Sequence, residues 1–148
     1  MLDILFKRYN SKRIQYANFY EKELFNSRHK PFNLLQIGMD SSIPVWHKYL
    51  EKSNIYCIDD FSKSEPNSYD FKDNSRTYWA RCDIHDSNSV NDIFKNFWNK
   101  PRFNIVIDNI NIFAHARYKF LKKHCIGKYY IEENEKVGIY YESVRYSS

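Results

Sequence analysis

The sequence has little glycine, proline or cysteine. Its 148 residues include 3 glycines and 4 prolines, which argues against a disordered chain and against an all-β fold with many tight turns. The three cysteines, Cys57, Cys82 and Cys125, are odd in number and far apart. They form no CxxC pair and no Cys/His cluster, which argues against a zinc site. A reduced, cytoplasmic setting fits this cysteine usage best.

Long apolar runs are also missing from the sequence. No segment approaches the length of a membrane span, and residues 1–8 are too short and too charged for a signal peptide. We therefore expect no membrane contact. The sequence also contains neither a GxxxxGK phosphate loop nor a serine in a nucleophile-elbow pattern. These two absences argue against two common phosphate-binding and hydrolytic sites.

The chain is basic, with a formal charge of +5 and a pI near 9.0. This charge is compatible with an anionic partner such as nucleic acid, a nucleotide or a phosphorylated sugar. It is also what a surface adapted for solubility would show. The lysines at 119, 122, 123 and 128 gather near the end of a predicted helix, where they complement the helix dipole. Nucleic acid therefore remains a weakly supported partner.

Apolar runs alternate with amphipathic segments along most of the chain, which predicts an α/β fold. The predicted strands are 33–38, 55–59, 77–82, 103–107 and 128–131, with 137–144 as a further candidate. The predicted helices are 3–9, 15–26, a segment from Ser41 or Ser42 to about Leu50, a segment from Asp86 or Ser87 to Trp98, and 114–124. Residues 61–75 are predicted to be a loop, and Gly127 is predicted to lie in a turn.

Strands that alternate with helices at this spacing form a parallel sheet with right-handed crossovers. We therefore predict one domain over residues 1–148, with a Rossmann-like, mainly parallel sheet of about five or six strands and flanking helices. Residues 1–30 would be an N-terminal helical extension and residues 33–148 the α/β core. The C-terminal hairpin would be reduced.

Small or polar residues stand at the carboxyl ends of the predicted strands. They are Gly38, Asp59 with Asp60, Asp83, Asp108 with Asn109, and Glu132 with Glu133. Parallel α/β sheets bind their ligands beyond the carboxyl ends of the strands. A glycine there lets the backbone approach a nucleoside, and an acid at the tip of the next strand accepts hydrogen bonds from ribose hydroxyls. The alternative is that strands end in polar residues simply because the chain turns there.

Six segments, in consistent order, also resemble a known family. They are Tyr9-Asn-Ser-Lys12, Leu34-Leu-Gln-Ile-Gly38, Ser42-Ile-Pro-Val-Trp46, Ile55-Tyr-Cys-Ile-Asp59, Ile105-Val-Ile-Asp-Asn109 and Gly127-Lys-Tyr-Tyr-Ile-Glu-Glu133. They are similar to motifs of the class I S-adenosylmethionine-dependent methyltransferases. Within that class they resemble the macrocin-type and capsular-polysaccharide sugar O-methyltransferases. The chain looks like a shortened, degenerate member of this group.

The resemblance implies a role for four residues in holding S-adenosylmethionine. Gly38 would lie under its methionine part, and Asp59 would hold the ribose hydroxyls. Asp83 would lie near the adenine, and Asp108 near the sulfonium and amino groups.

The resemblance also implies a magnesium site formed by Asn109, Glu132 and Glu133. Oxygen ligands suit this hard cation, which could polarise sugar hydroxyls for attack on the methyl group.

The sequence departs from the family pattern near this site. The glycine-rich turn is shorter, and Met39, Asp40 and Ser41 replace small residues. Asn109 stands where the family has a metal-binding carboxylate. The catalytic histidine of the family is replaced by an isoleucine. His115, one helical turn further on, is a candidate general base because imidazole titrates near neutral pH. The alternative is that His115 only packs or solvates its helix.

Two functions are therefore open. The one we favour is an S-adenosylmethionine-dependent O-methyltransferase that acts on a hydroxyl of a sugar, glycan or other small molecule. The alternative is a catalytically degenerate methyltransferase-fold protein that serves as a binding or assembly partner. An exposed edge at the incomplete side of the sheet would allow a homo-oligomer.

Overall fold

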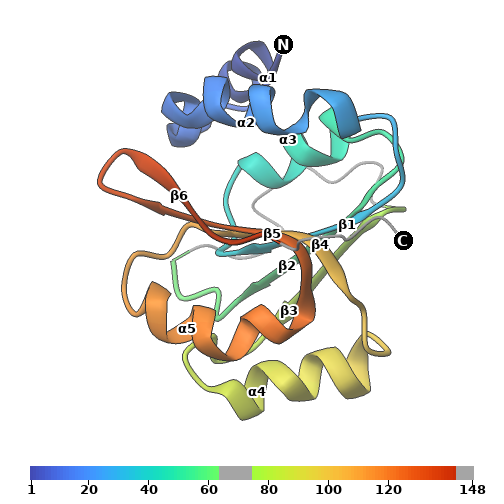
Figure 1. Ribbon diagram of the computed structural model, residues 1–148, viewed down its shortest axis with the longest axis vertical. Helices are drawn as coiled ribbons and strands as arrows, with labels where there is room; N and C mark the ends of the chain where they lie inside the picture. Colours follow the sequence, from blue (N-terminus) through green and yellow to red (C-terminus); the bar gives the residue numbers. More distant parts are fainter. Residues whose placement is uncertain (64–74, 143–148) are drawn as a thin grey trace.

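The protein is built around a six-stranded sheet with the strand order β3-β2-β1-β4-β5-β6. The computed structural model describes residues 1–63 and 75–142. The first five strands are parallel, and β6 is antiparallel to β5. Figure 1 shows the sheet between two layers of helices. The predicted Rossmann-like, mainly parallel sheet with flanking helices is confirmed.

The strands lie close to where the apolar runs predict them. They are β1 (Asn33–Ile37), β2 (Asn54–Asp59), β3 (Thr77–Arg81), β4 (Phe103–Asp108), β5 (Cys125–Glu133) and β6 (Lys136–Glu142). The neighbouring strands β1 and β4 lie at the centre of the sheet and are almost wholly buried. Helices cover both faces of these strands, which explains why their sequences are continuously apolar rather than alternating.

The helices form two layers on opposite faces of the sheet (Figure 1). One face carries α1 (Leu2–Arg8), α2 (Ala17–Leu24) and α3 (Ser42–Tyr49), and the other carries α4 (Ser87–Asp92) and α5 (Ala114–Leu121). Short 3₁₀ segments lie at Lys12–Tyr16, Phe25–Ser27 and Lys122–His124, and a π-helical turn lies at Ile93–Phe97. A separate buried hydrophobic cluster fills each face.

The N-terminal extension packs on α3 and on β5 through aromatic side chains, and the Tyr20 ring lies edge-on to that of Tyr130 in β5 at 5.8 Å. The Trp46 ring of α3 lies edge-on to the rings of Phe6 and Tyr20, with centroid distances of 5.5 and 5.2 Å. All three side chains are fully buried. Edge-to-face pairs of this kind add to the stabilisation that burial gives. The extension is therefore held close to the carboxyl ends of the strands, where the candidate site lies.

Two local predictions are corrected by the structure. Gly127 lies inside β5, not in a turn. A Cβ at this position would come within 2.0 Å of the backbone oxygen of Asn104. Only glycine lets β5 pass so close to β4. The predicted helix 15–26 is a 3₁₀ segment followed by α2 and a second 3₁₀ turn.

One of the two predicted helix caps is confirmed, and the other is corrected. The side chain of Asp86 caps α4 as expected, by accepting a 3.0 Å hydrogen bond from the backbone N–H of Asn88. The N-terminus of α3 is different. Its Ser42 N–H donates to Asp40 Oδ1 at 2.9 Å, and no side-chain cap is formed by Ser41.

The described part of the chain ends in the hairpin formed by β5 and β6. Asn134 and Glu135 at its turn both have positive φ, at 53° and 64°. Such a turn matches the twist of the two flanking strands. Residues 64–74 of the predicted loop and residues 143–144 of the predicted last strand lie outside the described residues. Among the helices described, none is long and apolar enough to cross a lipid bilayer.

Candidate functional site

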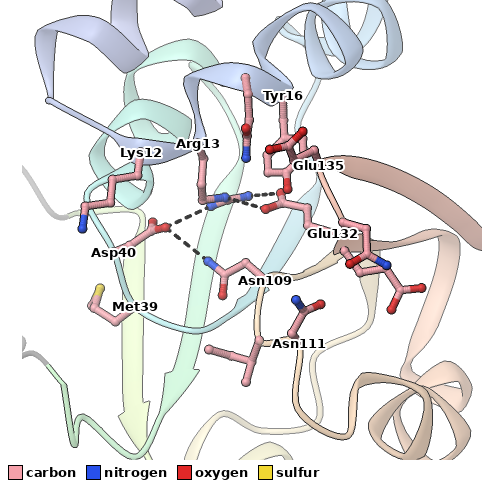
Figure 2. Close-up of a pocket in the computed structure, with 13 residues that line it drawn as sticks. Lys12, Arg13, Tyr16, Met39, Asp40, Asn109, Asn111, Glu132 and Glu135 are labelled. Atoms are coloured by element: carbon pink, nitrogen blue, oxygen red, sulfur yellow. Dashed lines mark hydrogen bonds and ion pairs between the residues drawn. The ribbon is translucent and has the colours of Figure 1, made fainter.

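An open pocket of about 470 Å³ lies at the carboxyl ends of the central strands (Figure 2). Its walls come from the 3₁₀ segment Lys12–Tyr16, from the residues that follow β1 and β4, and from the last residues of β5 with the turn after them. The residues around it are Lys12, Arg13, Gln15, Tyr16, Met39, Asp40, Asn109, Ile110, Asn111, Glu132, Glu133, Asn134 and Glu135. Three predicted site residues, Asn109, Glu132 and Glu133, are therefore brought together here. The N-terminal extension supplies a wall that the sequence did not predict.

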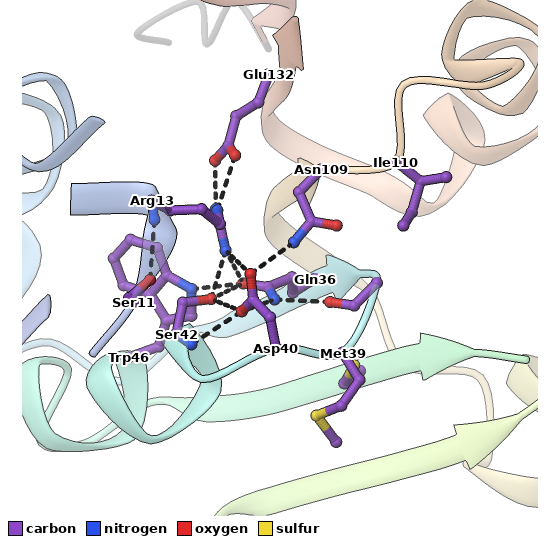
Figure 3. A network of polar contacts seen from close by, with 12 residues as sticks. Ser11, Arg13, Gln36, Met39, Asp40, Ser42, Trp46, Asn109, Ile110 and Glu132 are labelled. Carbon is purple, nitrogen blue, oxygen red and sulfur yellow. Dashed lines mark hydrogen bonds and ion pairs between the residues drawn. The ribbon is translucent and has the colours of Figure 1, made fainter. Parts of the chain in front are cut away.

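A buried arginine joins the two sides of this pocket (Figure 3). Arg13 donates from Nε to Glu132 Oε1 at 2.8 Å, and its Nη2 donates to Glu132 Oε2. Its Nη1 donates to Gln36 Oε1 at 2.9 Å and to the hydroxyl of Ser42, and lies 3.5 Å from Asp40 Oδ2. Burial opposes the charged form of Arg13, but Glu132 and Asp40 outweigh it, so the pKa of Arg13 is raised.

Asp40 connects the turn after β1 to the tip of β4. Its Oδ1 accepts hydrogen bonds from Ser42 N at 2.9 Å and from Gln36 Nε2 at 3.1 Å. Its Oδ2 accepts from Asn109 Nδ2 at 3.2 Å. Gln36 is fully buried within β1, and its Oε1 also accepts a 2.7 Å bond from Trp46 Nε1. A buried network with its partners in place rigidifies the elements that it connects.

The turns after β1 and β4 touch at Gly38. This residue has a φ of +101°, and a Cβ on it would lie 2.0 Å from Asn109 Oδ1 and 2.7 Å from Ile110 Cδ1. Both the backbone conformation and the space therefore require glycine. Asn109 Oδ1 is buried and, among the described residues, receives no hydrogen bond. The amide oxygen of Asn109 thus faces Gly38, and its nitrogen faces Asp40.

Asp59, the predicted ribose ligand, is bound to the turn that carries Gly38. Its Oδ2 accepts a 2.6 Å hydrogen bond from the backbone N–H of Met39, and its Oδ1 accepts one of 3.2 Å from Phe61 N. Its side chain is only partly buried, so carboxylate lone pairs remain for further donors. The structure therefore places the glycine turn and this acid side by side, at the ends of neighbouring parallel strands.

The four predicted cofactor ligands do not line this pocket: Gly38 and Asp59 lie beside it, next to Met39, and Asp83 and Asp108 have other partners. Asp83 is exposed and belongs to the turn before α4, where its Oδ1 accepts from His85 N at 3.0 Å. Asp108 is fully buried and accepts from Arg117 Nε and Nη2 at 2.8 and 3.0 Å. Burial raises the pKa of Asp108, although Arg117 acts in the opposite direction. A direct contact between the Asp108 carboxylate and a cofactor would require this pair to separate.

His115, the predicted base, stands behind Glu133. Its Nε2 lies 3.5 Å from Glu133 Oε1, and its ring centroid lies 5.0 Å from that of Tyr140. The side chain of His115 is 56% exposed, and that of Glu133 is 34% exposed. Glu133 lines the pocket and His115 does not, so the two residues form a line that leads from the pocket to α5.

The three predicted magnesium ligands do not converge on one point. Both oxygens of Glu132 are bonded to Arg13, Glu133 faces His115, and the amide oxygen of Asn109 faces Gly38. In the described residues, no three His, Cys, Asp or Glu side chains lie close enough to hold a metal ion. As arranged here, these residues do not fit the octahedral oxygen shell that Mg²⁺ requires.

Sequence reasoning overlooked the two buried arginines of this region. Arg13 binds Glu132, which lies 119 residues further along the chain, so no local motif marks this pair. Arg117 binds Asp108, 9 residues before it. One signal was available. Gln36 stands in the middle of an otherwise apolar strand, and a buried amide needs hydrogen-bond partners. Those partners include Arg13 and Asp40.

Comparison with solved structures identifies the fold. The chain aligns with MycE methyltransferase from the mycinamycin biosynthetic pathway in complex with Mg and SAH, with a TM-score of 0.72 and 23% identity, over 90% of this chain and 35% of MycE. The complex of MycE with Mg, SAH and mycinamycin VI gives a TM-score of 0.71 and 24% identity, over 90% of this chain and 34% of that one. The fold is therefore that of class I methyltransferases, and the chain spans about a third of MycE's length. No family model matches the sequence, and a search of curated proteins gives no match.

Proposed function

We propose that this methyltransferase-fold chain is an S-adenosylmethionine-dependent O-methyltransferase. The observation that carries the proposal is the 2.6 Å hydrogen bond between Met39 N and Asp59, which holds the Gly38 turn against the acid at the end of β2. Nucleosides bind beyond the carboxyl ends of parallel strands, where both of these residues lie. The likeness to MycE, which was crystallised with SAH, supports the same choice of cofactor.

The charges of the pocket favour a hydroxyl-bearing acceptor over nucleic acid. Two basic side chains, Lys12 and Arg13, face four carboxylates, Asp40, Glu132, Glu133 and Glu135. An acidic surface repels a phosphate backbone, whereas carboxylates accept hydrogen bonds from sugar hydroxyls. MycE complexed with mycinamycin VI is consistent with a small-molecule acceptor. We therefore propose a sugar or glycan hydroxyl as the methyl acceptor.

The residues of the site would act mainly by positioning. S-adenosylmethionine supplies an electrophilic methyl group bound to a sulfonium. Asp59 would hold the ribose hydroxyls, and Gly38 would let the cofactor approach the backbone. Glu133, backed by His115 at 3.5 Å, would accept the proton that the acceptor hydroxyl loses. Alignment of the two reacting groups provides most of the rate in such a transfer. We assign no step to magnesium, because its predicted ligands do not converge.

Titration with S-adenosylhomocysteine tests this proposal. We expect saturable binding by calorimetry to the full chain. The Asp59→Asn variant should bind more weakly by about tenfold or more, since hydrogen bonds to a charged group contribute roughly 1.5–3 kcal/mol. Asp92→Asn, at the far end of α4, is the matched control and should bind like the wild type. Thermal unfolding of each variant separates lost binding from lost structure. Absence of binding at millimolar ligand would refute the cofactor assignment.

The alternative, a non-catalytic binding or assembly partner, is favoured by one specific observation. The bonds of Arg13 to Glu132, Gln36 and Ser42 fill the space beside the shortened glycine turn with the protein's own side chains. If S-adenosylhomocysteine does not bind, this alternative gains support. If it binds but no methyl group is transferred to sugar hydroxyls, the chain would be a cofactor-binding protein without catalysis.

A further inference from the structure

The most unusual feature of the pocket is a buried cation surrounded by oxygen atoms. Arg13 contacts the carboxylates of Glu132 and Asp40, the amide oxygen of Gln36 and the hydroxyl of Ser42. Carboxylate and neutral oxygens in one place are the donor set that a hard divalent cation takes. In this chain a guanidinium occupies the centre of that set (Figure 3).

The contact between Arg13 and Glu132 leaves no free oxygen on the carboxylate. Nε and Nη2 of Arg13 each bind one oxygen of Glu132, in the two-pronged arrangement that makes arginine–carboxylate pairs strong. The buried hydroxyl of Tyr20 donates to the second oxygen as well. The side chains of Arg13 and Glu132 are only 8% and 4% exposed. A metal ion could reach Glu132 only by displacing partners that are themselves buried.

The positive charge of Arg13 also opposes the binding of a metal ion at Glu132. A divalent cation beside Arg13 would be repelled at short range, and repulsion is stronger in a buried site than in water. The guanidinium cannot relieve this repulsion by losing its proton, because arginine stays protonated in proteins. Displacing it from Glu132 would leave a buried charge without its partner, which is strongly unfavourable.

We propose that Arg13 takes the place of a divalent cation in this cleft and excludes such an ion from Glu132. It is a permanent positive charge that joins the N-terminal extension to the ends of β1 and β5. The inference goes beyond the proposed function and does not depend on it, since a cation site can be measured whether or not S-adenosylmethionine binds.

Titration with Mn²⁺ tests this proposal, and binding is measured as a loss of the electron paramagnetic resonance signal of the free ion. The full wild-type chain should show no saturable Mn²⁺ binding at millimolar concentration, and neither Mg²⁺ nor EDTA should change its unfolding temperature. The Arg13→Gln variant frees Glu132 and should gain saturable Mn²⁺ binding. The double variant Arg13→Gln/Glu132→Gln should lose it again. If Arg13→Gln is unfolded without metal, Mn²⁺ should restore its circular dichroism, because binding to the folded state stabilises that state.

Two results would overturn the inference. The first is one-to-one Mn²⁺ binding by the wild type that Glu132→Gln removes. The second is an Arg13→Gln variant that neither binds Mn²⁺ when folded nor folds when Mn²⁺ is added. Neither measurement uses S-adenosylhomocysteine, so a failure of cofactor binding leaves this inference unaffected.

Discussion

Replacing Arg117 by methionine should destabilise the protein by about 3–5 kcal/mol, the usual effect of removing one partner of a buried ion pair. Arg117 and Asp108 are 1% and 0% exposed, and two hydrogen bonds of 2.8 and 3.0 Å join them. Methionine fills much of the same volume but leaves the buried Asp108 carboxylate without its cationic partner, with only the 2.9 Å hydrogen bond from Ile110 N remaining. Urea unfolding measures the change in free energy.

The double variant Arg117→Met/Asp108→Leu separates the charge from the packing. It removes both ions at once, and a buried pair replaced by apolar side chains is often neutral in stability. We therefore expect it to recover most of the loss. Lys119→Met is the matched control on the exposed side of α5, and it should change stability by less than about 0.5 kcal/mol. A loss below about 1 kcal/mol for Arg117→Met would contradict the structural role of this pair.

A substitution of Asp108 itself tests the role predicted for this residue. Arg117 also donates to the backbone oxygens of Ile110 and Ile112, so it fixes the segment between β4 and α5 that carries Asn109. If Asp108 acts mainly through this segment, Asp108→Asn should lower stability more than affinity for S-adenosylhomocysteine. If instead it contacts the cofactor, affinity should fall while stability changes little.

The fold could be predicted because its signals are local. The apolar runs 33–38 and 103–107 are long enough, and bounded sharply enough, to mark buried parallel strands. Local signals fail where a neighbouring strand decides the outcome. Glycine is typical of a turn, yet Gly127 lies within β5, and the reason for glycine there is that the backbone of Asn104 leaves no space for a side chain.

The candidate site was only partly predictable for a related reason. The strand-end rule places Gly38, Asp59, Asn109 and Glu133 near one another, since it depends on topology alone. It says nothing of where a side chain points. Arg13 reaches Glu132 across 119 residues, and that pairing depends on how the extension packs on the sheet. No spacing in the sequence encodes it.

Replacing Gly38 by alanine should both destabilise the protein and abolish binding of S-adenosylhomocysteine. A side chain at a φ of +101° costs about 1–3 kcal/mol in backbone strain alone. The new Cβ would also lie 2.0 Å from Asn109 Oδ1, so Asn109 must move and its 3.2 Å bond to Asp40 must break. Urea unfolding and calorimetric titration measure the two effects.

A second substitution distinguishes steric overlap from backbone strain at Gly38. Asn109→Ala in the Gly38→Ala background removes the overlapping amide and should recover part of the stability, while the strain remains. Gly138→Ala is the comparison for stability, because its Cβ would meet the Tyr140 ring rather than the tip of β4; that ring can turn at the cost of its 3.3 Å bond to Glu133 and its contact with His115, so the loss should be smaller than in Gly38→Ala. Wild-type stability and affinity in Gly38→Ala would show that the turns after β1 and β4 are not in contact. The crevice on which the proposed function depends would then have a different shape, since that contact brings the glycine turn, Asp40 and Asn109 to the same edge of the pocket.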